Sequence, residues 1–133
     1  MGRALMDANV LVAVYRPDDS LHKKAVQLLS KVKDLGGGLV LTNLVVQEIA
    51  TVLSMRVGMK LARKFMNDYG DIADESIYID EELEKASWKI FLKQEKKGTS
   101  FVDCASLAVM EKYKLDGILT FDEFYPKEVR IGV

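Results

Sequence analysis

Four acidic residues stand out because each lies within or beside a hydrophobic segment. They are Asp7, Glu48, Asp103 and Asp122. No lysine or arginine is adjacent in sequence to any of the four, so at close range the carboxylates would repel one another unless a cation lay between them. Carboxylates without His or Cys partners select hard ions such as Mg²⁺ or Mn²⁺. Such ions hold a phosphate, activate a water and stabilise a leaving oxygen, so the four acids point to metal-assisted phosphoryl chemistry.

Each acid also has a structural explanation when it is taken alone. Ser100 and Asp103 have the spacing of a capping box, and an acid in the first turn is favourable at the positive end of a helix dipole. Asp122 follows a hydrophobic segment, where an ordinary turn residue often stands. Glu48 has mainly apolar helical neighbours, which indicates the wall of a cleft. The functional hypothesis therefore depends on the four acids together.

Short hydrophobic strands and amphipathic helices alternate along the chain and must position these acids. Strands are predicted at residues 4–6, 39–41, 76–79, 118–121 and 129–131, the last at an edge. Helices are predicted at residues 21–35, 44–57, 59–69, 81–96 and 101–110, with caps at Ser20, Thr42 or Asn43, Asp80, and Thr99 or Ser100. The alternation predicts an α/β fold with a mainly parallel sheet covered on both faces. The acids then lie at the carboxyl ends of the strands, where open sheets bind ligands.

Length and composition fit one globular domain, residues 1–133, that is large enough to bury a core. The 19 basic and 20 acidic residues leave a formal net charge of −1, so any surface for nucleic acid must be local. No run of about 18 apolar residues predicts a membrane span, and the first residues do not resemble an export signal.

The single cysteine and the single histidine exclude several other kinds of site. Cys104 by itself forms no internal disulfide, which favours a cytoplasmic location. A zinc site built from Cys and His is excluded, and so is a catalytic triad using His22, which lies in a polar segment. Cys104 is assigned to the core, because the adjacent charge of Asp103 raises a thiol pKa and disfavours the reactive thiolate.

Four segments of the chain resemble the signature segments of PIN-domain ribonucleases. They are Asp7-Ala8-Asn9-Val10-Leu11, Thr42-Asn43 followed by Glu48, Ser100-Phe101-Val102-Asp103, and Thr120-Phe121-Asp122. The resemblance runs from Leu5 to Tyr125, and the size and order are most similar to the VapC-like toxins of toxin–antitoxin pairs. One departure is that both Phe124 and Tyr125 follow the last acid, where the family often has an aromatic residue three positions later.

This resemblance implies a PIN-like three-layer sandwich with a central sheet of four or five strands. It also implies metal-dependent endonucleolytic cleavage of RNA, with Mg²⁺ or Mn²⁺ at the acidic cluster Asp7, Glu48, Asp103 and Asp122. The polar residues that match positions near the family's site are Asn9, Ser100 and Thr120. Members of the family form homodimers and are inhibited by a small antitoxin protein, so we expect both partners here.

A local basic surface is predicted where helices 44–57 and 59–69 meet. Its residues are Arg56, Lys60, Arg63 and Lys64, at positions i, i+4, i+7 and i+8. We interpret them as a candidate RNA-binding stripe, although an ordinary solvated helix face has the same pattern.

Two other functions fit parts of the sequence. An RNA-processing nuclease outside a toxin–antitoxin pair would use the same acids, and a small reading frame just upstream of the gene would distinguish the two. A receiver-like regulatory domain would bind Mg²⁺ in an acidic pocket without cleaving RNA. That class also needs a lysine after a late strand, and here none follows the 118–121 strand until Lys127.

Overall fold

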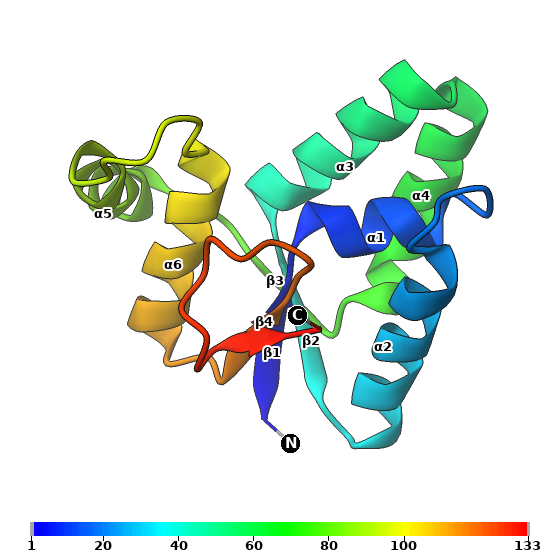
Figure 1. Cartoon of the computed structure of the whole chain (residues 1–133), viewed down its shortest axis with the longest axis horizontal. Coiled ribbons are helices and arrows are strands. Elements are labelled where there is room, and N and C mark those ends of the chain that lie inside the picture. The colour runs from blue at the N-terminus through cyan, green and yellow to red at the C-terminus, as the bar shows by residue number, and fades with distance from the viewer. Residues whose placement is uncertain (1, 133) are drawn as a thin grey trace.

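A computed structural model describes residues 2–132 of the chain, and its centre is a five-stranded sheet of order β3-β2-β1-β4-β5. The strands are β1 (Arg3–Met6), β2 (Gly38–Thr42), β3 (Glu75–Ile77), β4 (Gly117–Leu119) and β5 (Arg130–Ile131). The helices are α1 (Ala8–Val14), α2 (His22–Asp34), α3 (Asn43–Arg56), α4 (Met59–Ile72), α5 (Glu81–Leu92) and α6 (Phe101–Tyr113). All four strand pairings are parallel, so the predicted α/β architecture is confirmed (Figure 1).

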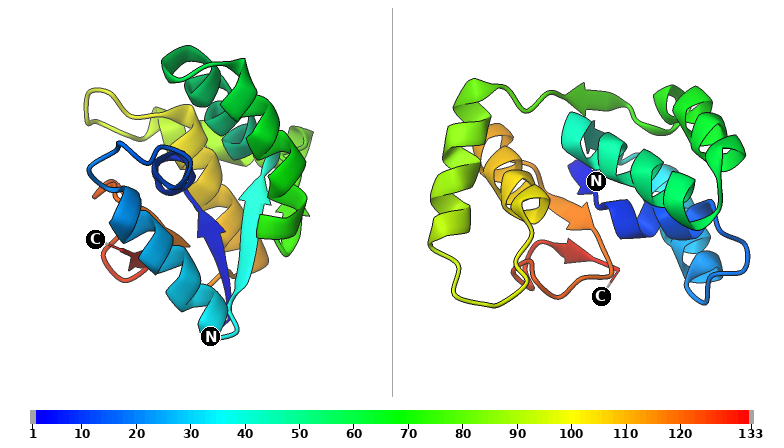
Figure 2. Two further views of the ribbon diagram at one scale, coloured as in Figure 1. Left: turned by 90° about the vertical axis from the view of Figure 1, so that its right-hand side faces the viewer. Right: turned by 90° about the horizontal axis from the view of Figure 1, so that it is seen from above.

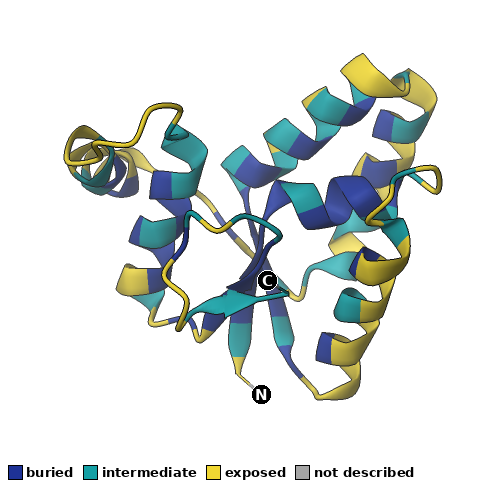
Figure 3. Ribbon diagram, viewed as in Figure 1, coloured by how far each residue is buried: buried dark blue, intermediate teal, exposed yellow. Residues whose placement is uncertain are grey.

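Alternate side chains of the strands pack into two separate hydrophobic layers. Ala4 and Met6 of β1 belong to the layer formed with α1, α2, α3 and α4, whereas Leu5 belongs to the layer formed with α5 and α6. The view from above shows the two groups of helices on opposite sides of the sheet (Figure 2). Because both faces are covered, residues 4–6 of β1 form a continuous apolar run, and all three are buried (Figure 3).

The sheet order distinguishes this fold from a receiver-like module. Receiver modules have the strand order 2-1-3-4-5, in which the first strand is followed by the third. Here β1 lies between β2 and β4. The receiver-like alternative is therefore wrong for this chain. Within residues 2–132, no helix is long and apolar enough to cross a lipid bilayer.

Several helices differ from the predictions: α1 was not predicted, and α4 and α6 each end three residues later than expected. Helix α5 ends at Leu92 and not at residue 96, because the backbone turns there and the side-chain amide of Gln94 donates to the carbonyl of Ile90 at 3.2 Å. Helix α2 has no side-chain cap from Ser20; the carboxylate of Asp19 instead accepts the backbone N–H of Leu21 at 2.8 Å. The predicted caps Thr42, Asp80 and Ser100 all accept backbone N–H groups of α3, α5 and α6.

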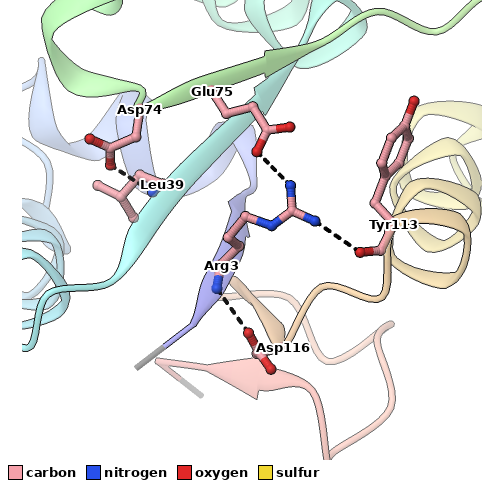
Figure 4. A network of polar contacts seen from close by, with 6 residues as sticks. All are labelled: Arg3, Leu39, Asp74, Glu75, Tyr113 and Asp116. Carbon is pink, nitrogen blue, oxygen red and sulfur yellow. Dashed lines mark hydrogen bonds and ion pairs between the residues drawn. The ribbon is translucent and has the colours of Figure 1, made fainter.

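A polar network fixes the amino ends of the strands, at the edge opposite the four candidate acids (Figure 4). The guanidinium of Arg3 donates to Glu75 at 2.6 Å and to the carbonyl of Tyr113 at 3.0 Å, while its backbone N–H donates to Asp116 at 2.8 Å. Asp74 accepts the N–H of Leu39 at 2.8 Å. These contacts join β1, β2, β3 and the end of α6, so the acids of this edge have structural partners.

Candidate active site at the carboxyl ends of the strands

Asp7 connects the ends of the two central strands. It directly follows β1 and caps α1, where its Oδ1 accepts the N–H of Ala8 at 2.8 Å. Its Oδ2 accepts the hydroxyl of Thr120, which directly follows β4, at 2.8 Å. The backbone N–H of Asp7 also donates to the carbonyl of Leu119 at 2.8 Å. With both carboxylate oxygens bonded and only 4% of the residue exposed, Asp7 has a fixed orientation.

The surroundings of Asp7 disfavour its charged form. Burial is the largest cause, and it raises the pKa from an ordinary value of 3.8 to about 7. The hydrogen bonds from Thr120 and Ala8 lower the pKa, whereas the charges of Asp103 and Glu48 raise it. The carboxylates of Asp7, of Glu48 in α3 and of Asp103 in α6 are therefore close enough to repel one another.

Glu48 lies in the second turn of α3 and is partly buried. Its pKa is raised, first by burial and then by the charge of Asp103. The residue lines a cleft of about 280 Å³ together with Asn9 of α1, Asp19 of the following loop and Arg56 at the end of α3. Among residues 2–132, Glu48 is the one candidate acid whose carboxylate accepts no protein hydrogen bond.

Asp103 lies in the first turn of α6, and the hydroxyl of Tyr125 donates to its Oδ1 at 2.9 Å. Burial raises the pKa of Asp103, the Tyr125 hydrogen bond lowers it, and the charge of Asp122 raises it. Tyr125 is only 1% exposed, and burial together with the charges of Asp7 and Asp103 raises the pKa of its own hydroxyl. The sequence did not predict this role of Tyr125; it showed only that two aromatic residues, Phe124 and Tyr125, follow the last acid.

Replacing Tyr125 with Phe should raise the pKa of Asp103 further, because the ring remains while the hydrogen bond that stabilises the carboxylate is lost. The lost bond should also lower the free energy of unfolding by about 1 kcal/mol. Carboxyl NMR titration and thermal unfolding of the metal-free protein measure the two effects. The control is Tyr113→Phe, at the opposite edge of the sheet (Figure 4), which should change neither. An unchanged Asp103 titration in Tyr125→Phe would contradict the role of the hydroxyl.

Asp122 begins the loop that follows β4, and its carboxylate is partly used by that loop. Its Oδ1 accepts the N–H of Phe124 at 2.9 Å, and its own N–H donates to the hydroxyl of Thr120 at 2.9 Å. The Thr120 hydroxyl thus connects Asp122 to Asp7. The structure brings Asp122 close enough for its charge to raise the pKa of Asp103.

The remaining polar residues predicted for the site hold its backbone in place. Asn9 accepts the N–H of Phe121 through its Oδ1 at 3.3 Å, which fixes the final loop against α1. Ser100 caps α6 by accepting the N–H of Val102 at 3.1 Å, one residue before Asp103. Both side chains therefore help to position the backbone that carries the acids.

The four acids have the donor chemistry that a hard divalent ion needs. No lysine or arginine within residues 2–132 forms an ion pair with any of them, so no ion pair offsets their repulsion. No three Asp, Glu, His or Cys side chains of this part of the chain converge closely enough to enclose one ion. Mg²⁺ commonly binds through one or two carboxylates and completes its shell with water and phosphate oxygens, so an open acidic site of this kind fits it.

The predicted basic stripe does not form one helix face. The chain turns at Val57 and at Gly58, whose φ is +130°, and the helical spacing ends there. Arg56 lies in the cleft beside Glu48. The other three basic residues belong to α4, where Arg63 lines a different groove and Lys64 pairs with Asp68 at 2.9 Å.

Cys104 lies in the core, as predicted, and His22 makes a structural contact. Cys104 is fully buried, and burial followed by the charge of Asp103 raises the pKa of its thiol. The Nδ1 of His22 lies 2.8 Å from the carbonyl of Ala13 and ties the start of α2 to α1.

Comparisons with known proteins agree with this architecture. The family model described as PIN domain matches residues 4–127. The Mycobacterium tuberculosis protein VapC20, described as a sarcin-ricin loop cleaving toxin, has a similar structure, with a TM-score of 0.82 at 23% identity over 91% of each chain. A toxin–antitoxin complex from Klebsiella pneumoniae gives a TM-score of 0.65 at 18% identity, over 96% of this chain and 95% of that chain. Rickettsia felis VapBC2, solved with promoter DNA, gives 0.68 at 12% identity over 98% of each chain. No curated protein matches.

Proposed function

Since this chain belongs to the PIN-domain family, we propose that it is a divalent-metal-dependent endoribonuclease and the toxin of a toxin–antitoxin pair. The observation that carries the proposal is the arrangement of acids at the carboxyl edge of the sheet: Thr120 connects Asp7 to Asp122, Tyr125 holds Asp103, and the charges of Asp103 and Glu48 raise the pKa of Asp7. A structural cap needs one carboxylate, whereas a group of mutually repelling acids costs stability and is typical of a functional site.

The residues that would hold the ion are Asp7, Glu48, Asp103 and Asp122. When it is bound, Mg²⁺ or Mn²⁺ neutralises the carboxylates and supplies the Lewis acidity that activates a water beside a phosphodiester. Thr120 and Ala8 hold the two oxygens of Asp7, and Tyr125 holds Oδ1 of Asp103, so these side chains meet a ligand in fixed orientations. This preorganisation avoids the cost of ordering the site during the reaction.

Glu48 is the group that we assign to proton transfer. Its carboxylate has no protein hydrogen bond within residues 2–132, and its raised pKa makes it a better base than an exposed glutamate. One of its Oε atoms takes a proton of the attacking water as the water oxygen bonds to phosphorus and the bond from phosphorus to the leaving oxygen breaks, with solvent protonating the leaving oxygen. The other Oε atom remains available to the ion. Arg56, in the same cleft, is positioned to bind a phosphate of the RNA, and Lys60, Arg63 and Lys64 extend the positive charge along α4.

A protein partner is also part of the proposal. The groove between α3 and α4 has a volume of about 450 Å³. Two exposed methionines, Met59 and Met66, line this groove, and Met55 and Val57, where α3 ends, are exposed as well. Several large exposed apolar side chains are unusual for a surface without a partner. We propose a small antitoxin as one partner and a second copy of the chain as another. RNA as the substrate and the single buried thiol fit a cytoplasmic location.

Removing divalent metal should abolish cleavage of single-stranded RNA, because the carboxylates by themselves repel a phosphodiester. Rigorously purified protein is dialysed against EDTA and assayed on a labelled oligoribonucleotide, then assayed again after Mg²⁺ or Mn²⁺ is restored. Activity is expected only in the restored samples. The control is Glu48→Gln, which should stay inactive with metal and thereby exclude a contaminating nuclease. Undiminished cleavage in excess EDTA would contradict the metal requirement.

A further inference from the structure

Three aromatic rings gather where the end of α5 meets the start of α6, and we call them the aromatic platform: Trp88, Phe91 and Phe101. The ring centroids of Trp88 and Phe101 are 4.3 Å apart, and those of Trp88 and Phe91 are 5.6 Å apart in an edge-to-face arrangement. The indole N–H of Trp88 donates to Glu84 at 3.3 Å, which orients the ring. Trp88 nevertheless remains 43% exposed, so part of its aromatic surface is open to a ligand.

The platform stands beside the candidate active site. Phe101 is the first residue of α6, and Asp103 lies in the same helical turn. Residues two apart project from different sides of a helix, so a strand that contacts both the platform and Asp103 must cross the N-terminal end of α6. An RNA strand that stacks a base on the platform and crosses this end of α6 can therefore place a following phosphate near the acids.

A positively charged loop joins the two helices above the platform. Its three lysines, Lys93, Lys96 and Lys97, are all exposed, and Glu95 is the one acid among residues 93–100. None of the three lysines forms an ion pair with any other residue in the described part of the chain. The hydroxyl of Thr99 donates to the carbonyl of Lys96 at 2.7 Å, which fixes the loop before α6.

We propose that the aromatic platform stacks a base of single-stranded RNA while Lys93, Lys96 and Lys97 bind its phosphates; this inference rests on the proposed function, because it identifies how the same site selects unpaired RNA. Every base has a flat face, so a tryptophan beside lysines binds single strands with little sequence preference. A duplex keeps its bases stacked inside and cannot use the platform.

Charge favours RNA over a second copy of the chain as the occupant. A symmetric dimer interface places the same patch of each copy against the other. Centred on the lysine loop, it would bring two sets of three lysines together, against Glu95 of each loop and the Glu84 that contacts each Trp88. RNA phosphates are negatively charged and attract these lysines.

Binding is measured by the emission of Trp88, which is the only tryptophan of the chain, in EDTA so that no cleavage occurs. Oligoadenylate should quench this emission, whereas the duplex of oligoadenylate with oligouridylate should not. Anisotropy of labelled oligoadenylate then gives the affinity of variants. Trp88→Leu should weaken binding by about 5- to 150-fold, the range expected for one lost stacked base, and Trp88→Phe should restore most of it.

Two controls separate stacking from other causes. Leu92→Ala removes a neighbouring side chain that is 76% exposed and has no aromatic face, so RNA affinity should not change. Trp88→Leu should leave the salt dependence of binding unchanged, because the ring contacts no phosphate. The double variant Lys96→Ala, Lys97→Ala should reduce the slope of log K against log salt by about 1.4, since each phosphate contact on a single strand contributes about 0.7.

The platform would be disproved by equal oligoadenylate affinities of wild type and folded Trp88→Leu. It would also be disproved if Leu92→Ala weakened binding as much, or if emission changed with protein concentration alone, which would indicate a protein occupant. The two proposals fail separately. Protein that binds through Trp88 but never cleaves with Mg²⁺ contradicts the nuclease, whereas protein that cleaves equally well without Trp88 contradicts only the platform.

Discussion

Asp7→Asn should make the metal-free protein more stable than wild type at about pH 8, by about 3 kcal/mol. Burial is the main cause that raises the pKa of Asp7 from 3.8 to about 7, so ionising this carboxylate costs the folded state about 4 kcal/mol. Asparagine has a similar size and caps helices as well as aspartate does. The Thr120 hydroxyl loses its acceptor, which costs about 1 kcal/mol and leaves a net gain.

The same substitution should remove the part of the pH dependence of the free energy of unfolding that Asp7 causes. Because the pKa of Asp7 is higher in the folded chain than in the unfolded one, the folded chain binds more protons between about pH 4 and pH 7. The contribution of Asp7 to the free energy of unfolding therefore falls across this range and becomes constant above it. In Asp7→Asn this fall should be absent.

Urea unfolding in EDTA at several pH values measures both effects. The matched control is Asp80→Asn, which also replaces a capping carboxylate, at α5 and outside the acidic cluster. It should keep the pH dependence of wild type. If Asp7→Asn is less stable than wild type at pH 8, or if its pH dependence is unchanged, the charge of Asp7 does not strain the fold and the account of the cluster fails.

Asp103→Asn should abolish detectable RNA cleavage and also remove most of the stabilisation by metal. The substitution takes away a charge that repels Asp7 and Glu48, so the metal-free variant should be at least as stable as wild type. Metal that bound only the folded cluster would stabilise wild type by mass action, by about 2.7 kcal/mol at 100 times its dissociation constant. For a chain of this length, this raises the melting temperature by roughly 10 °C.

Melting curves with EDTA and with Mg²⁺ or Mn²⁺ separate a site residue from a structural cap. If Asp103 is a site residue, added metal should raise the melting temperature of Asp103→Asn only slightly and that of wild type by much more. Ser100→Ala provides the comparison, because it removes the cap of α6 while all four acids remain. It should melt at a lower temperature and keep its metal response. Asp103 would instead be a structural cap if Asp103→Asn melted several degrees below wild type in EDTA and metal raised the melting temperature of both proteins equally.

Much of the architecture followed from local patterns in the sequence. The strands near residues 4–6 and 39–41 are continuous apolar runs because both of their faces are buried, and such runs are readable without any knowledge of the fold. The predicted end of α5 was wrong by four residues, because residues 93–96 are two lysines, a glutamine and a glutamate, all good helix formers that would continue the helix by one turn. Propensity could not reveal that the backbone turns there to bring Phe101 against Trp88.

The sequence by itself determined which residue types can do chemistry: four acids without adjacent basic residues, placed where parallel strands end. Only the tertiary structure decided how they are held. Thr120 reaches Asp7 across 113 positions of the chain, and Tyr125 reaches Asp103 across 22. The turn at Gly58 likewise divides a basic pattern that looks continuous in the sequence. The physical reason is that helical and strand periods depend on neighbouring residues, whereas hydrogen bonds and repulsions between side chains depend on distances that only the packed sheet fixes.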